Sequence, residues 1–258
     1  MLNLNTHKYA IKCNKNKYLK SLCIPFIACC IFLLFSFIPH LASLIFEQTE
    51  LHIPKTYIIY NSILKCILIT AIGFMAYLFY ATFSLGEEAW YSGRLTFKKN
   101  CFKRFIYWFK PTKAFKALSL KSILMCLRIF WTFVFLIPAT VTATTIFLTA
   151  FNGGIEIHLF LSLSAGTLAL LICGIIFRFV FIQRYFLSEF ILAQNPNNGV
   201  IQSIKKSKNL MDGQIFRVIL FKIGFVPLFL SCIMIIPIFF VYPHYKQSRS
   251  IIANALMI

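Results

Sequence analysis

Five long stretches of apolar residues constrain the fold of this chain more than any other feature of its sequence. A bilayer core of about 30 Å is crossed by roughly 20 apolar residues in a helix. Because hydrocarbon offers the backbone no hydrogen-bond partners, such stretches must be helical. They cover approximately residues 21–46, 66–85, 129–151, 158–177 and 223–242. The sequence therefore predicts an all-α fold, a polytopic helical membrane bundle with about five spans.

The composition agrees with a membrane environment. Hydrophobic residues make up 59% of the 258 residues and charged residues only 13%, whereas a soluble domain is about a quarter charged. The mean hydropathy is +0.79. We therefore expect a single integral membrane domain over residues 1–258, with no soluble domain attached. The many Lys, Asn, Ile and Phe residues suit a low-GC bacterium, so we expect a multi-pass protein of a bacterial cell membrane.

Lysine and arginine residues concentrate on one side of the predicted spans. Cytoplasmic segments of membrane proteins are enriched in them, which predicts a cytoplasmic N-terminus. With five spans the C-terminus is then outside, but Lys246 and Arg249 weaken that step, and a re-entrant segment or sixth half-span would reverse it. The basic residues assigned to the cytoplasm are Lys8, Lys12, Lys15, Lys17, Lys20, Arg94, Lys98, Lys99, Lys103, Arg104, Lys110, Lys113, Lys116, Lys121, Arg178, Arg184, Lys205, Lys206, Lys208, Arg217 and Lys222.

The net charge of +19 raises nucleic acid as a partner. However, the cations lie beside apolar runs, so anionic lipid headgroups are the expected counter-charge, and nucleic acid is not expected.

The nine cysteines form no CxxC pairing, and most lie in or beside apolar runs, where Cys behaves as a small hydrophobe. Neither a zinc site nor a disulfide framework is predicted, and no cofactor is expected.

Two segments are predicted to be interfacial helices. Over residues 96–118, aromatic and basic residues alternate, as in helices that lie in the headgroup plane, although Pro111 should break or kink this one. Over 199–213, a short helix should follow the turn at Asn195-Pro196, with Gly213 as its C-terminal cap. The first segment is either a plain connector that obeys the charge rule or a surface that senses lipids or binds a partner.

The C-terminal third resembles a known family. The residues that carry the resemblance are Arg184 to Pro196 (RYFLSEFILAQNP), Ser203 to Gly213 (SIKKSKNLMDG) and a last span that ends near Tyr242-Pro243. The pattern is similar to an uncharacterised bacterial multi-pass membrane family, the domain-of-unknown-function group nine-seven-five. That group is related in style to the membrane domain found beside some glycerophosphodiester phosphodiesterases.

This resemblance covers roughly residues 170–245 and departs from the family pattern at two points. Gln194 stands where an acidic residue usually precedes Asn-Pro, and the aromatic pair expected after the closing Pro is missing from the tail over 251–258. The resemblance implies a multi-pass membrane module without an assigned activity. It therefore supports the predicted fold more than any particular function.

Ionisable residues offer few candidates for chemistry. Every acidic residue falls outside the middle of a predicted span, whereas ion-coupled transporters keep such groups inside the bundle. Glu87 and Glu88 could pair with Arg94 or with cations of the next segment, or could form a solvated helix start near the positive end of the dipole. Glu189 is expected to form a structural ion pair with Arg184 and Arg178, rather than a functional site.

A metal site on the outer face is the remaining candidate. His is the commonest metal ligand, but no HExxH-like spacing exists, so isolated interfacial histidines are the preferred interpretation and no metal-binding residue is assigned. The candidate ligands are His40, His52, His158, His244, Glu47, Glu50 and Glu156. Separately, Gly166, Gly174 and Gly224 could allow close contact between helices.

Catalytic motifs for nucleophilic or phosphate chemistry are absent from the sequence, so we do not expect an enzyme. The first hypothesis is a non-enzymatic membrane module that packs with lipids or partner proteins, as an accessory to transport, export or envelope maintenance. The alternative is a permease-type subunit for a peptide, lipid or other amphipathic substrate that works with a separate ATPase. An intramembrane enzyme is the third and weakest hypothesis.

Overall fold

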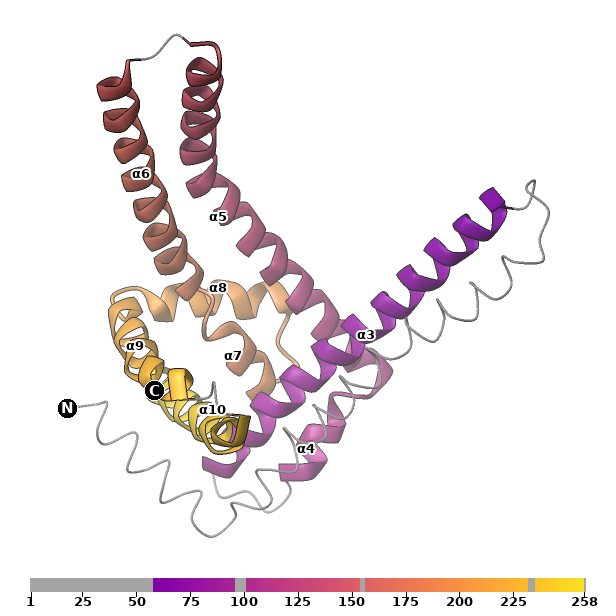
Figure 1. The fold of residues 1–258 in the computed structure, drawn as a ribbon. Coiled ribbons are helices and arrows are strands. Elements are labelled where there is room, and N and C mark those ends of the chain that lie inside the picture. The colour runs from indigo at the N-terminus through magenta and orange to yellow at the C-terminus, as the bar shows by residue number, and fades with distance from the viewer. Residues whose placement is uncertain (1–57, 96–100, 154–155, 232–234, 258) are drawn as a thin grey trace.

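The computed structural model describes residues 58–95, 101–153, 156–231 and 235–257, and every regular element among them is an α-helix (Figure 1). The helices are α3 (Ile58–Leu95), α4 (Cys101–Tyr107), α5 (Pro111–Phe151), α6 (Ile157–Gln183), α7 (Ser188–Gln194), α8 (Val200–Met211), α9 (Ile215–Ser231) and α10 (Ile235–Met257). The predicted all-α fold is therefore confirmed for the described residues.

Three stretches are long and apolar enough to cross a membrane. They are Cys66–Gly93, Pro111–Phe151 and Ile157–Gln194, and a fourth exists if α8 and α9, which meet at 89°, are one bent span. These stretches contain the second, third and fourth predicted spans. The first, residues 21–46, lies outside the described residues. With its 41 residues, α5 is about 60 Å long at 1.5 Å per residue, so it extends well beyond a bilayer core.

Helices α5 and α6 form a long antiparallel hairpin that projects away from the rest of the molecule (Figure 1). The hairpin turns at Asn152 and Gly153, and Gly153 adopts φ 72°, which glycine tolerates without steric cost. At Gly174 the two backbones approach so closely that an added Cβ would lie 2.5 Å from the carbonyl oxygen of Phe135. The predicted close contact at Gly174 is confirmed, whereas an added Cβ at Gly166 would meet nothing within 4 Å.

The basic aromatic segment is not one interfacial helix over 96–118. Helix α4 ends at Tyr107 and α5 begins at Pro111, because proline is well suited to the first turn of a helix and poorly suited to its interior. The rings of α4 pack on α3: the centroid of Phe105 lies 5.4 Å from that of Phe83. The second half of the predicted segment is thus the start of α5, a helix long and apolar enough to cross a membrane.

The turn and helix predicted after α7 are confirmed as local structure. Helix α8 runs from Val200 to Met211, and Gly213 adopts φ 78°. The backbone N–H of Gly199 donates to the side chain of Gln202, which closes the first turn. The hydroxyl of Ser207 donates to the carbonyl of Arg184 at 3.0 Å and accepts the N–H of Leu187 at 3.2 Å, so α8 supports the turn between α6 and α7.

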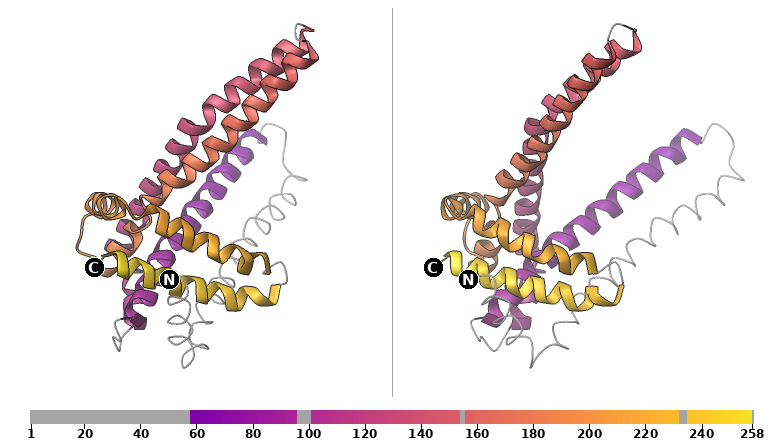
Figure 2. Two further views of the ribbon diagram at one scale, coloured as in Figure 1. Left: turned by 90° about the vertical axis from the view of Figure 1, so that its left-hand side faces the viewer. Right: turned by 60° about the vertical axis from the view of Figure 1, so that its left-hand side comes forward.

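The predicted span over 223–242 is not a single described helix, because α9 ends at Ser231 and α10 begins at Ile235. The two helices run side by side in opposite directions (Figure 2). Tyr245 packs on Phe221, Phe225 and Phe229 along one side of α9. The C-terminal half of α10 therefore returns to the end of the bundle where α7 and α8 lie, whereas the side of the membrane on which the C-terminus lies stays a prediction.

The core lies where these helices converge. One cluster joins α7, α9 and α10 around Phe190, Phe221 and Phe225. A second joins α3, α5 and α7 around Trp108 and Leu120. Both clusters sit at the base of the α5–α6 hairpin, so buried contacts concentrate at this end of the molecule.

Candidate functional site

Six charged side chains meet between the two core clusters, and we call this group the charge junction. It consists of the carboxylates of Glu87, Glu88 and Glu189 and the cations Lys121, Lys246 and Arg249. Helix α3 supplies two carboxylates, α5 and α7 supply one charge each, and α10 supplies two cations. The junction therefore ties four helices together at one level of the bundle.

The ion pairs form a continuous chain across the bundle. Lys246 Nζ lies 2.8 Å from Glu87 Oε2 and 3.0 Å from Glu88 Oε1. Arg249 bridges to Glu88 Oε1 at 3.1 Å through Nη1 and to Glu189 Oε2 at 3.4 Å through Nη2. Lys121 Nζ completes the chain 2.7 Å from Glu189 Oε1.

Helical spacing brings the cations of α10 to one face. Tyr242, Lys246 and Arg249 are separated by four and three residues, so they follow one another along the same side of the helix. The hydroxyl of Tyr242 donates to Glu87 Oε2 at 3.0 Å, which extends the same row. A single face of α10 therefore matches the carboxylates of α3 and α7.

The junction is almost entirely excluded from solvent. Glu88 is fully buried, and the side chain of Glu189 is 6% exposed. Burial alone would favour neutral Lys246, but the carboxylates of Glu87 and Glu88 outweigh it and raise the pKa of Lys246 well above its usual range. Burial also disfavours the charged form of Arg249, but the carboxylates of Glu88 and Glu189 outweigh this effect and raise the pKa of Arg249. Both cations thus stay charged.

Three carboxylates and three cations give the junction a net charge of zero. Its hydrogen bonding is incomplete among the described residues: Glu87 Oε1, Glu88 Oε2 and Arg249 Nε have no partner there. Removing one member of a buried ion pair strands its partner and typically costs about 3–5 kcal/mol. The arrangement can hold helices in fixed register.

The structure corrects two sequence-based expectations about these residues. Glu87 and Glu88 do not form a solvated helix start, because α3 continues through them to Leu95 and buries both. Glu189 does form an ion pair, but with Lys121 and Arg249 instead of Arg184 and Arg178. All three carboxylates are thus buried in the bundle, although none of them falls in the middle of a predicted span.

The predicted partners of Glu189 make other contacts. Arg178 Nε donates to the hydroxyl of Thr132 at 2.7 Å, which links α6 to α5. The guanidinium of Arg184 lies 5.0 Å from the ring centroid of Phe181. The ion pairs of Glu189 are made by Lys121 and Arg249 instead.

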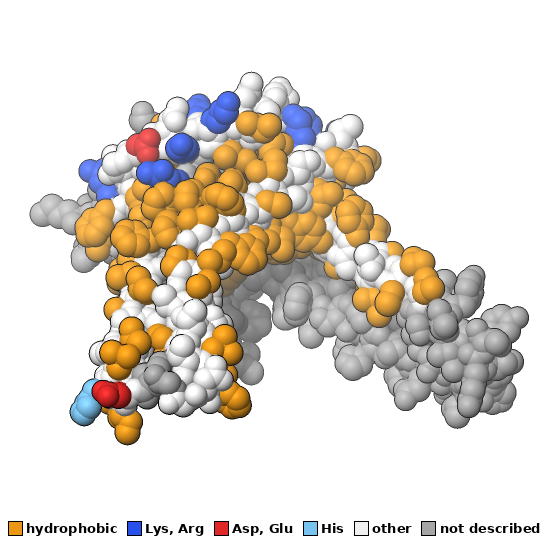
Figure 3. Space-filling view, turned by 90° about the horizontal axis from the view of Figure 1, so that it is seen from above, with side chains coloured by type: hydrophobic (Ala, Val, Ile, Leu, Met, Phe, Trp, Pro, Cys, Tyr) orange, Lys and Arg blue, Asp and Glu red, His pale blue; other side chains and the backbone are white. Residues whose placement is uncertain are grey.

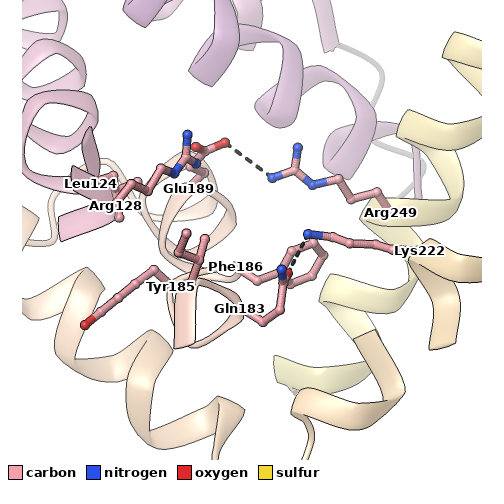
Figure 4. Close-up of a pocket in the computed structure, with 9 residues that line it drawn as sticks. Leu124, Arg128, Gln183, Tyr185, Phe186, Glu189, Lys222 and Arg249 are labelled. Carbon is pink, nitrogen blue, oxygen red and sulfur yellow. Dashed lines mark hydrogen bonds and ion pairs between the residues drawn. The ribbon is translucent and has the colours of Figure 1, made fainter. Parts of the chain in front are cut away.

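A small cavity opens beside the junction (Figure 4). Its volume is about 60 Å³. Arg128 and Leu124 line it from α5, while Lys222 and Arg249 reach it from α9 and α10 (Figure 4). The remaining lining residues come from the end of α6, the turn that follows it and the start of α7, and they are Ile182, Gln183, Tyr185, Phe186 and Glu189.

The two histidines in the described residues do not converge. His158 lies in the first turn of α6 at the far tip of the hairpin, whereas His244 of α10 packs on the ring of Phe225 at 5.6 Å. His40, His52, Glu47 and Glu50 lie outside the described residues. Across the described parts of the chain, no group of three or more His, Cys, Asp or Glu residues is arranged to hold a metal ion.

Sequence reasoning missed Lys246 and Arg249 as parts of a site and used them only to judge topology. A usable signal exists: Tyr242, Lys246 and Arg249 follow helical spacing in a chain with only seven acidic residues. Two adjacent carboxylates that continue an apolar helix need cations from elsewhere. That signal predicts that Glu87 and Glu88 pair with cations, but it does not identify the cations.

Comparison of the chain with protein-family models, with curated proteins and with solved structures finds no match.

Proposed function

We propose that this chain is a non-enzymatic integral membrane module that contacts lipids and membrane-protein partners, as an accessory to transport, export or envelope maintenance. The observation that carries the proposal is the α5–α6 hairpin, which exposes apolar side chains along most of its length. Phe133, Phe147 and Ile176 are 58%, 68% and 55% exposed. Surface of this kind needs lipid or another apolar partner.

The distribution of charge supports the same proposal. Hydrophobic side chains spread over both arms of the molecule, while Lys and Arg side chains gather along one edge (Figure 3). The exposed cations include Lys205, Lys206 and Lys208 of α8. We propose that this end faces the cytoplasm of a cell membrane, where anionic headgroups attract cations, and that α8 lies at the interface.

A permease-type subunit is the second candidate, and the charge junction favours it. Buried ionisable groups within spanning helices often mark a transport path. In the charge junction, three carboxylates are paired with three cations, and this pairing suits a structural clamp better than an open transport path. A separate ATPase would have to supply the energy for a permease.

Site-specific photocrosslinking tests the proposal. A photoreactive phenylalanine analogue at Phe147 is expected to give adducts with lipids or membrane proteins in intact membranes. The same analogue at Phe190, which is fully buried, is the matched control and should give neither. An absence of both kinds of adduct at Phe147, with the chain recovered folded in detergent-free buffer, would contradict the proposal. An ATPase among the adducts would favour the permease.

A further inference from the structure

The cavity beside the charge junction carries more positive charge than its neighbours neutralise. Within the junction, the three carboxylates are matched by Lys121, Lys246 and Arg249. Lys222 and Arg128 also line the cavity, and no described carboxylate lies within ion-pair distance of either. The cavity therefore has two cations in excess.

Lys222 is held in place without a counter-ion among the described residues. Its ammonium group donates to the side-chain oxygen of Gln183. The same nitrogen lies 5.4 Å from the ring centroid of Phe186 and 5.8 Å from that of Phe179. Neutral and aromatic partners orient a cation but leave its charge uncompensated. Figure 4 shows this amine and the Arg249 guanidinium side by side on one wall of the cavity.

The cavity has room for a small polar ligand. A cavity needs about 10–15 Å³ to hold one water molecule. The volume of this cavity, about 60 Å³, is several times larger. Its walls provide donors from Arg128, Lys222 and Arg249. Guanidinium groups bind oxyanions through paired N–H donors, and Lys adds a point charge. Of the common biological anions, a phosphate group best fits this donor set.

The position of the cavity connects it to the lipid-facing surface. Lys222 lies one residue before Ile223, and Phe179 lies four residues before Gln183. Ile223 and Phe179 are 55% and 41% exposed, and Val226, one turn further along α9, is 49% exposed. Apolar surface thus leads from the cavity along α6 and α9. An acyl chain could follow it while the phosphate stays among the cations.

We infer that this cavity binds a phosphate group, carried either by an anionic phospholipid or by free phosphate. The inference deepens the proposed function and rests on it for the membrane location. Lys222 and Arg128 neutralise the anion, and Arg249 adds a donor while it remains paired with Glu88 and Glu189. The ligand thereby joins α5 to α9 at the point where the hairpin meets the charge junction.

Native mass spectrometry of the full chain in detergent tests the inference. The probes are phosphatidylglycerol, phosphatidylcholine and inorganic phosphate. Wild-type protein is expected to retain phosphatidylglycerol over phosphatidylcholine, and Lys222→Gln or Arg128→Gln should each lower that preference about fivefold, the usual effect of one cation near an anionic headgroup. Lys205→Gln removes an exposed charge of α8 outside the cavity and is the matched control, which should keep the preference.

The two phosphate sources give different results. If millimolar inorganic phosphate displaces bound phosphatidylglycerol, free phosphate is a ligand of the same cations. If it does not displace the lipid, the phospholipid is the ligand. Equal losses in Lys222→Gln and Lys205→Gln, or no preference and no phosphate binding in the wild type, would overturn the inference. Adducts from Phe147 would persist in that case, so failure of the site is distinguishable from failure of the proposed function. Unchanged thermal unfolding confirms that each variant is folded.

Discussion

The α5–α6 hairpin and the charge junction share two apolar stretches, Pro111–Phe151 and Ile157–Gln194, yet the hairpin exposes apolar side chains and the junction buries charged ones. The hairpin has few buried side chains and exposes Phe and Ile residues over most of its surface. The junction buries six charges, among them Glu88 with no exposed surface. We propose that lipid is the solvent of the first region, whereas other side chains surround the charged groups of the second. One apolar stretch can therefore expose apolar side chains over part of its length and bury a charged side chain in another part.

The comparison also shows where stability resides. Neighbouring helices in lipid gain little from apolar contact alone, because the lipid is as apolar as they are. Close backbone approach at Gly174 and the Arg178–Thr132 hydrogen bond hold the hairpin together. In the junction, paired charges fix which helices meet. Substitutions should accordingly have large effects in the junction and graded effects in the hairpin.

The largest effect is expected for Arg249→Met. Arg249 bridges Glu88 and Glu189, so its loss leaves three buried carboxylates with two cations. We expect the free energy of unfolding to fall by about 3–5 kcal/mol, measured by equilibrium unfolding in mixed micelles. Arg217→Met removes an exposed arginine of α9 and should change stability little. Similar losses in both variants would mean that the junction is not a structural clamp.

An intermediate effect is expected for Gly174→Ala. The new methyl group would lie 2.5 Å from the carbonyl oxygen of Phe135, so α5 and α6 must separate. A cost of about 1–3 kcal/mol is typical of such overpacking, and the same unfolding assay measures it. Gly166→Ala on the same helix meets open space and is the control. If both variants were equally stable, the close approach of the two helices would be refuted.

The smallest effect is expected for Phe147→Ala. This side chain is 68% exposed and faces the lipid in our account, so the change in stability should stay within about 0.5 kcal/mol. Phe190→Ala, in the core between α7 and α9, should cost about 3–5 kcal/mol. A large loss for Phe147→Ala in the monomer would show that the hairpin is packed against protein.

The difference between the two regions also explains what the sequence could predict. Hydropathy is a local property, so the helices containing residues 66–85, 129–151 and 158–177 were predictable, as were the turn at Asn195-Pro196 and the capping role of Gly213. Buried charge pairing depends on residues distant in the chain. Glu87 and Lys246 are 159 positions apart, and neither neighbourhood indicates the other.

The C-terminal helix shows the same limit. Hydropathy continues across residues 223–242, so a single span was the natural interpretation. The cations at Lys246 and Arg249 find their counter-charges on α3 and α7, which requires α10 to run back along α9. Tertiary electrostatics therefore decides the direction of the last helix. The family resemblance, which rests on residues 170–245, stays a prediction.

The most direct test of this account compares two topology reporters in cells. One is inserted after Ser203, which lies in α8, and the other follows Ile258. Because the charge junction holds the end of α10 beside α3 and α7, we expect both reporters to be active on the same side of the membrane. Activity on opposite sides would require residues 223–242 to cross the bilayer once, and the charge junction could not then form.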